Sequence, residues 1–95
     1  MLIRVVRSGG FAGIRKQGAV ETTDLSPERR AHVEGIVERA EFFTLPERHV
    51  SGLPDVVTYR VSIEAGPQSR EISFDERTAP EELLELVRDV LNRKS

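Results

Sequence analysis

The chain has 95 residues, of which 38% are apolar and 32% charged, with a net charge of −2 and no cysteine. This length and apolar content exclude two domains or a disordered chain, so we expect residues 1–95 to form a single domain. The absence of cysteine excludes disulfides, thiolate metal ligands and a cysteine nucleophile, and it fits a reducing compartment.

The N-terminal segment is locally basic. Residues 1–20 contain four basic residues and no acid, although the remainder of the chain is acidic. These residues are either scattered in solvent or form a patch for an acidic partner surface. Nucleic acid is a less favoured partner, because the chain as a whole is mildly acidic and no aromatic platforms accompany the basic residues.

The first apolar run shows no targeting or membrane signal. Arginines interrupt it, so it lacks the continuous apolar core of a signal peptide and the length of a membrane span. We therefore expect a cytoplasmic protein that does not bind membranes.

The first half of the chain predicts two strands and a helix. Residues 2–7 are rich in β-branched and large apolar side chains, and residues 18–23 fit a second strand. Ser26 and Pro27 predict a helix start, because the serine oxygen can accept a free backbone N–H and proline needs none at the first helical position. The apolar positions of this helix and its end predict one buried face, made of Val33, Ile36, Val37, Ala40, Phe42 and Phe43.

The third quarter predicts a loop and a strand hairpin. Residues 44–54 contain two Leu-Pro pairs and a glycine, which indicates a long loop with restrained ends. Residues 57–65 alternate apolar and polar side chains, as expected of a strand with one buried face. After a Gly-Pro turn, the alternation continues, with Ile72 and Phe74 predicted to point inward and Glu71, Ser73 and Asp75 outward.

The last segment predicts a second helix that ends near residue 92. Thr78 and Glu81 have the spacing of a capping box, in which each side chain bonds the other residue's backbone N–H. The predicted buried stripe consists of Leu83, Leu84, Val87, Val90 and Leu91, with Leu86 at its margin.

The order of these elements, β-β-α-β-β-α, predicts an α+β fold. Its simplest arrangement is a four-stranded antiparallel sheet with both helices packed on one face.

The residues needed for catalysis or metal binding are not found in a recognisable pattern. His32 and His49 have no histidine partner at helical spacing. Ser8 is followed by two glycines rather than standing in Gly-x-Ser-x-Gly, and no helix is predicted after it. We therefore expect neither an enzyme nor a bound cofactor or metal.

The glycine-rich segment 9–13 presents a phenylalanine. A phosphate-binding loop would need a helix directly afterwards, whereas the following residues lead to another strand. Glycines allow the main chain to approach a partner closely, and an exposed aromatic side chain is unfavourable in water. Phe11 therefore either folds back into the core or serves as a docking contact.

The same segment carries a resemblance to a known family. The run Arg7, Ser8, Gly9, Gly10, Phe11, Ala12 and Gly13 resembles the emfourin family of protein inhibitors of protealysin-type (thermolysin-like) zinc metallopeptidases. The resemblance continues over nearly the whole chain, through residues 40–46, 55–60, 74–76 and 80. The heptapeptide and the Phe-Phe-x-Leu-Pro run are fairly specific, whereas the strand and helix patterns alone are not.

The resemblance implies a reversible, non-enzymatic inhibitor that blocks the active-site cleft of a thermolysin-like zinc metallopeptidase with exposed loops. Enzymes of that class have an acidic cleft beside an apolar pocket, so the inhibitor is expected to supply main chain and an apolar side chain. Two loops could do so: the one with Gly10 and Phe11, which we prefer, and the segment around Val50, Leu53 and Pro54. The alternative is a regulatory or scaffolding module that binds another protein or nucleic acid through a strand edge or the basic patch.

Overall fold

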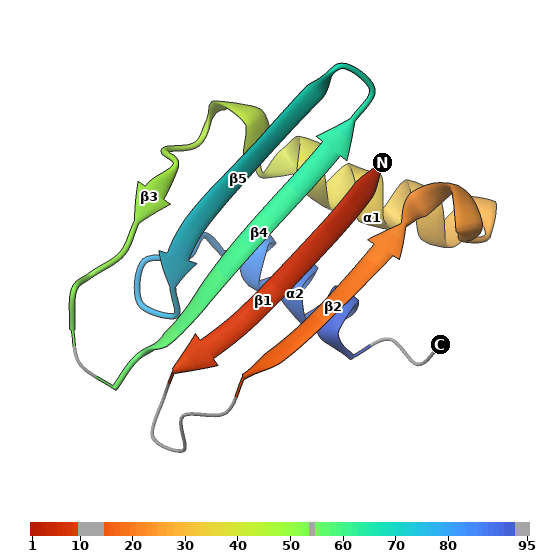
Figure 1. The fold of residues 1–95 in the computed structure, drawn as a ribbon. Helices are drawn as coiled ribbons and strands as arrows, with labels where there is room; N and C mark the ends of the chain where they lie inside the picture. The colour runs from red at the N-terminus through yellow and green to blue at the C-terminus, as the bar shows by residue number, and fades with distance from the viewer. Residues whose placement is uncertain (10–14, 54, 93–95) are drawn as a thin grey trace.

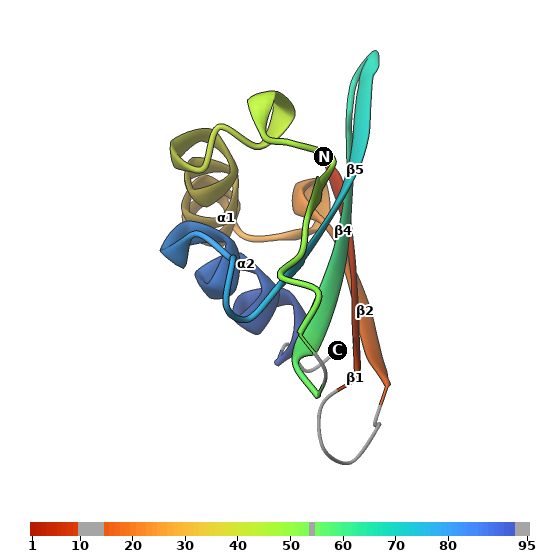
Figure 2. The same ribbon diagram turned by 90° about the vertical axis from the view of Figure 1, so that its left-hand side faces the viewer.

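The computed structural model describes residues 1–9, 15–53 and 55–92 of the chain. In this part a single sheet carries two α-helices on the same face (Figures 1 and 2). The elements are β1 (Leu2–Gly9), β2 (Lys16–Glu21), the short 3-10 turn η1 (Thr22–Asp24), α1 (Pro27–Arg39), η2 (Phe42–Thr44), β3 (Arg48–His49), β4 (Val57–Ala65), β5 (Gln68–Asp75) and α2 (Glu81–Leu91).

The strand order in the sheet is β2-β1-β4-β5-β3. The first four of these strands are antiparallel to their neighbours, which confirms the predicted four-stranded antiparallel sheet and the β-β-α-β-β-α order. The two-residue strand β3 adds a parallel fifth strand beside β5, in a segment predicted to be loop. Strand β1 lies between β2 and β4, so it forms hydrogen bonds on both sides.

The core lies between the sheet and the two helices. The predicted alternation is confirmed, since Val61, Ile63, Ile72 and Phe74 are all buried on the helix-covered face. From the helices, the buried side chains are Val33, Ile36, Val37, Leu83, Leu86, Val87 and Val90. Leu86 is therefore fully in the core rather than at its margin, whereas Leu84 and Leu91 are only partly buried.

The predicted N-terminal cap of α1 is confirmed, and that of α2 is not. The side chain of Ser26 accepts a hydrogen bond from the backbone N–H of Arg29 at 3.3 Å, which confirms the predicted cap of α1. The predicted capping box of α2 is wrong, because Pro80 is the N-cap residue and the α2 start has no side-chain cap. The Thr78 hydroxyl instead accepts from the backbone N–H of Asp75 at 3.1 Å.

Two strand predictions also need correction. Residues 22–23 were assigned to the second strand but belong to η1, where the backbone N–H of Thr22 donates to the carbonyl oxygen of Met1 at 2.9 Å. Asp75 was expected to face solvent, yet it is buried, because the chain near Ser51 covers it and bonds its carboxylate. None of the helices in the described ranges is long and apolar enough to cross a membrane.

Candidate functional site

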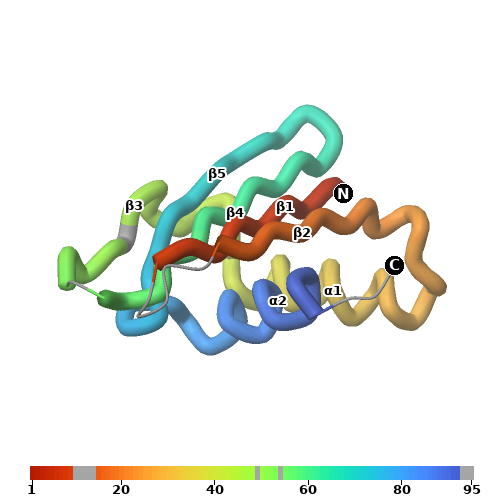
Figure 3. Tube along the Cα trace, turned by 60° about the horizontal axis from the view of Figure 1, so that its bottom comes forward, coloured from red at the N-terminus to blue at the C-terminus, as the bar shows by residue number. Residues whose placement is uncertain are grey.

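The described residues that flank the two candidate loops lie at one end of the sheet. Gly9, the last residue of β1, pairs with Val57, the first residue of β4. The end of β1 and the start of β4 are therefore neighbours at the same end of the sheet (Figure 3). We call this end, defined by Arg7–Gly9, Arg15–Lys16 and Val50–Leu53, the loop end of the sheet.

The structure places some of the predicted site residues and not others. At the loop end Arg7, Gly9 and Leu53 are exposed, and Ser8 and Val50 are partly buried. The remaining candidates lie outside the described residues; these are Gly10, Phe11, Ala12, Gly13 and Pro54. The choice between a core and a docking role for Phe11 therefore stays a prediction.

Gly9 shows why a glycine ends β1. Its φ is +83°, a conformation that residues with a side chain rarely adopt. A Cβ atom at this position would lie 2.9 Å from the carbonyl oxygen of Val56, which is too close for two non-bonded atoms. Gly9 thus allows the two backbones of the loop end to approach each other.

The segment before β4 is held by a single carboxylate. One oxygen of Asp75, Oδ2, accepts hydrogen bonds from the backbone N–H of Ser51 at 2.5 Å and from its hydroxyl at 2.6 Å. The other oxygen, Oδ1, accepts from the backbone N–H groups of Arg77 at 2.8 Å and Thr78 at 3.0 Å. These bonds, those from Ser51 first, hold the pKa of Asp75 well below its usual range, so the carboxylate stays ionised at neutral pH.

Leu53 is the apolar side chain of this segment that reaches solvent. It is 49% exposed, and it is the large hydrophobic residue left exposed among residues 1–9, 15–53 and 55–92. Its backbone N–H donates to the hydroxyl oxygen of Ser51 at 3.3 Å. Gly52, between them, has a φ of +77°.

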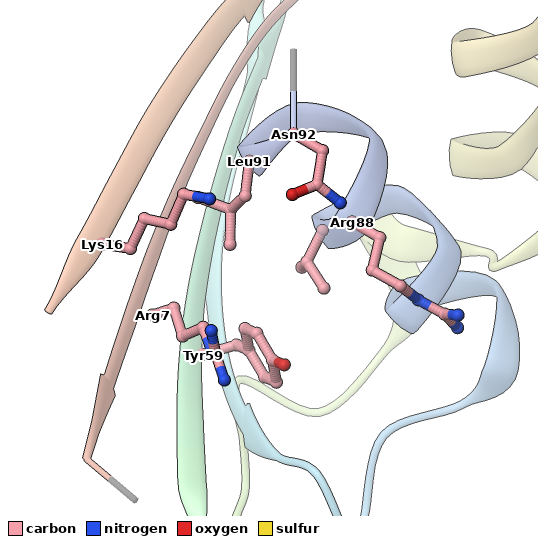
Figure 4. A pocket seen from close by; sticks show the side chains of 7 residues that line it. Arg7, Lys16, Tyr59, Arg88, Leu91 and Asn92 are labelled. Carbon is pink, nitrogen blue, oxygen red and sulfur yellow. The ribbon is translucent and has the colours of Figure 1, made fainter. Parts of the chain in front are cut away.

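A basic hollow of about 260 Å³ lies beside the loop end, on the helix-covered face. Arg7 and Tyr59 enter it from neighbouring strands, and Leu91 and Asn92 enter it from the end of α2 (Figure 4). Its other lining residues are Lys16, Val87 and Arg88. Arg88 Nε donates a hydrogen bond to the Leu84 carbonyl oxygen at 3.1 Å, and the side chains of Arg7, Lys16 and Arg88 are all exposed, so each contributes positive charge to this surface.

A smaller hollow of about 170 Å³ lies at the same end, on the face of the sheet without helices. Its lining residues are Val6, Ser8, Arg15, Thr58, Arg60 and Ser73. Arginines thus occur on both faces of the sheet at the end of β1. Such a surface favours an acidic partner, because opposite charge increases the rate of encounter.

Residues 1–9, 15–53 and 55–92 contain no cluster of metal-binding side chains. In these ranges no three His, Asp or Glu side chains are grouped so that they could hold a metal ion. His32 Nε2 lies 3.7 Å from Glu85 Oε1, and both side chains are exposed. The described part of the loop end exposes the basic side chains of Arg7, Arg15 and Lys16 and the apolar side chain of Leu53.

Asp75 and Ser51 were missed at the sequence level. Asp75 was assigned to the wet face from strand alternation, and Ser51 was treated only as part of a loop. A signal was present, because an aspartate followed three residues later by threonine at the end of a strand is typical of a local side-chain-to-backbone turn. The partner of the second oxygen, 24 residues earlier, has no local signal.

Comparisons with known proteins identify the family. The emfourin family model matches residues 5–91, a range that contains β4, the second half of β1 and all the residues that define the loop end. Among solved structures, the chain is similar to emfourin (M4in) from Serratia proteamaculans, described as an M4 family peptidase inhibitor, with 26% identity over 90% of this chain and 83% of that one and a TM-score of 0.45. No curated protein sequence matches the chain. Because the family model covers most of its length, the chain belongs to the emfourin family.

Proposed function

We propose that residues 1–95 form a single inhibitor domain that reversibly binds a protealysin-type (thermolysin-like) zinc metallopeptidase and blocks its active-site cleft with the loop end. Emfourins are peptidase inhibitors and not enzymes, so family membership supports this class of function. The basic, non-catalytic character of the loop end agrees with it. The proposed site of action is the cytoplasm.

The pairing of Gly9 with Val57 carries the proposal. A cleft-blocking inhibitor has to present main chain and an apolar side chain together on one surface. This pairing puts the end of β1, which leads into the first candidate loop, beside the start of β4, which follows the second. This arrangement supports the proposal that both loops contact the same partner. The proposed binding surface therefore combines the two loops that the sequence treated as alternatives.

Each part of this surface has a proposed role. Arg7 supplies positive charge toward the acidic cleft of the peptidase. Ser8 and Gly9 bring main-chain groups to the rim of that cleft. Phe11 and Leu53 are the proposed apolar contacts. The remaining members of the surface are Gly10, Ala12, Gly13, Val50 and Pro54.

The direct test is a titration of the purified protein against a thermolysin-like peptidase. We expect loss of peptidase activity at about one-to-one stoichiometry, recovery of activity after dilution, and no cleavage of peptide substrates by the protein alone. Full peptidase activity at a large molar excess over several enzymes of this class, including one encoded by the source organism, would contradict the proposal. Such an outcome would favour the regulatory or scaffolding alternative.

Charge reversal at Arg7 should slow the association with the peptidase. Arg7 is exposed and lines the basic hollow, so Arg7→Glu should lower the association rate constant by about ten-fold at low salt and make it less dependent on ionic strength. The dissociation rate constant should change much less. Stopped-flow inhibition kinetics at several salt concentrations measure both.

Arg39→Glu is the matched control for this charge effect. Arg39 is also exposed, but it ends α1 at the opposite end of the molecule, where the neighbouring Glu38 shares a hollow with Met1. Both variants change the net charge equally. Equal slowing by both would show that only net charge matters, and the steering role of Arg7 would have to be abandoned.

A further inference from the structure

We propose that Asp75 is a positioning residue for partner binding, which fixes the segment Ser51–Leu53 so that Leu53 is presented to an apolar pocket of the peptidase. This inference rests on the proposed function and deepens it. It assigns a role to a buried residue of β5 that does not itself reach the partner.

The starting observation is the exposure of Leu53. A half-exposed leucine on a loop is an apolar surface that a partner can cover, and covering it is favourable because the area leaves water. Leu53 lies at the loop end, in the segment that leads into β4, and Arg7 lies at the same end of the sheet, where it lines the basic hollow. A partner with an acidic rim and an apolar pocket would match both features.

The second observation is that the backbone before Leu53 is fixed without the partner. The Ser51 hydroxyl donates to Asp75 Oδ2 at 2.6 Å, and its oxygen accepts from the Leu53 N–H at 3.3 Å. The Ser51 N–H donates to the same Oδ2 at 2.5 Å. A continuous chain of hydrogen bonds therefore connects the carboxylate to the residue that presents the apolar side chain.

The third observation is that the carboxylate is itself rigidly held. Asp75 is 1% exposed, and its Oδ1 accepts two backbone N–H groups of the turn that leads to α2. Its own N–H donates to the Thr78 hydroxyl oxygen at 3.1 Å. The Asp75 carboxylate is thus fixed at the end of β5, a strand that pairs with β4 over its whole length.

From these observations we expect a higher affinity for the partner than a mobile Ser51–Leu53 segment would give. A mobile loop loses conformational entropy when a partner orders it, and this loss weakens binding. A loop that is ordered before binding avoids that loss. Asp75 would therefore act on affinity through the conformation of Ser51–Leu53 and not through direct contact.

The test compares Leu53→Ala, Ser51→Ala and the double variant in inhibition of a thermolysin-like peptidase. Leu53→Ala should raise the inhibition constant about 30-fold, the scale of a hot-spot side chain. Ser51→Ala should raise it about ten-fold, since it removes a hydrogen bond to a charged group. In the Leu53→Ala background, Ser51→Ala should change the constant by less than about two-fold, because its effect acts through Leu53.

Ser69→Ala is the matched control, because Ser69 is an exposed serine at the opposite end of β5. It should leave the inhibition constant unchanged.

Asp75→Asn is the second probe and should weaken inhibition at least as much as Ser51→Ala. Asp75 also supports the turn before α2, so the thermal midpoint of the Asp75→Asn variant is measured in parallel. If this variant does not fold, the test depends on Ser51→Ala.

The outcomes separate this inference from the function on which it rests. If the parent protein inhibits no thermolysin-like peptidase, both proposals fall. If the parent inhibits but Ser51→Ala does not weaken it, or if the effects of Ser51→Ala and Leu53→Ala simply add, the positioning role of Asp75 is wrong while the inhibitor function stands. Weakening by both single variants with no further loss in the double variant supports the inference.

Discussion

Phe74→Ala should cost about 3–5 kcal/mol of the free energy of unfolding, a large share of the stability of a domain of this size. Phe74 is 1% exposed, and its ring stacks on that of Tyr59 with centroids 5.4 Å apart. Truncation removes this contact and leaves a cavity between the sheet and α2. Chemical denaturation followed by circular dichroism measures the loss.

Phe43→Ala provides the comparison for this large effect. Phe43 is of the same residue type but is only partly buried, in edge-to-face contact with Phe42 at 5.5 Å between centroids. Its truncation should cost clearly less, because it removes less area from the apolar interior. A loss below about 1 kcal/mol for Phe74→Ala, or a larger loss for Phe43→Ala, would be inconsistent with the packing described above.

Gly9→Ala should destabilise the protein by about 1–3 kcal/mol and also weaken inhibition. The left-handed conformation at φ +83° disfavours any side chain, and the new Cβ would meet the Val56 carbonyl oxygen at 2.9 Å. Relief of this contact requires β1 and the start of β4 to move apart. Thermal unfolding and the inhibition constant of the same sample report the two effects.

Gly66→Ala separates the effect of the positive φ from the effect of the close contact with the Val56 carbonyl oxygen. Gly66 also has a positive φ, +60°, but its Cβ would meet nothing within 4 Å, and it lies in the hairpin at the other end of β4. It should therefore show only the conformational part of the destabilisation and inhibit normally. If Gly9→Ala inhibits as well as Gly66→Ala, close approach of the two backbones is not needed for binding.

The fold was predictable from the sequence where local patterns decide it. The alternation over residues 57–65 gave the buried face of β4 because strand side chains alternate between the two faces of a sheet. Ser26 gave the start of α1 for an equally local reason, since a cap bonds the N–H three residues away. Both features depend on neighbours in the sequence.

The errors arose where distant segments decide the outcome. Alternation placed Asp75 in solvent, but Ser51, from a loop far away in the sequence, covers and bonds it. The same interaction network takes up Thr78, which otherwise matches the pattern of a capping box. Strand β3 was missed because two residues carry no periodicity, and only the edge of β5 defines them as a strand.

The candidate site was predictable as two separate loops and not as one surface. Their glycines, prolines and apolar side chains singled them out individually. The strands that flank them, β1 and β4, are separated in the sequence by a helix and more than 30 residues, and only the complete sheet specifies their pairing and register. Local sequence patterns therefore favoured a choice between the loops, whereas the topology places the strands that flank them side by side.

The hairpin between β4 and β5 offers a practical handle for experiments. Its turn at Gly66 and Pro67 is exposed and lies at the far end of both strands from Gly9 and Leu53 (Figure 1). A fluorescent dye, a spin label or a surface tether attached there would report on complex formation without standing between the protein and its target. A cysteine introduced at Pro67 would be the unique thiol of the chain, so such labelling needs no prior removal of native cysteines.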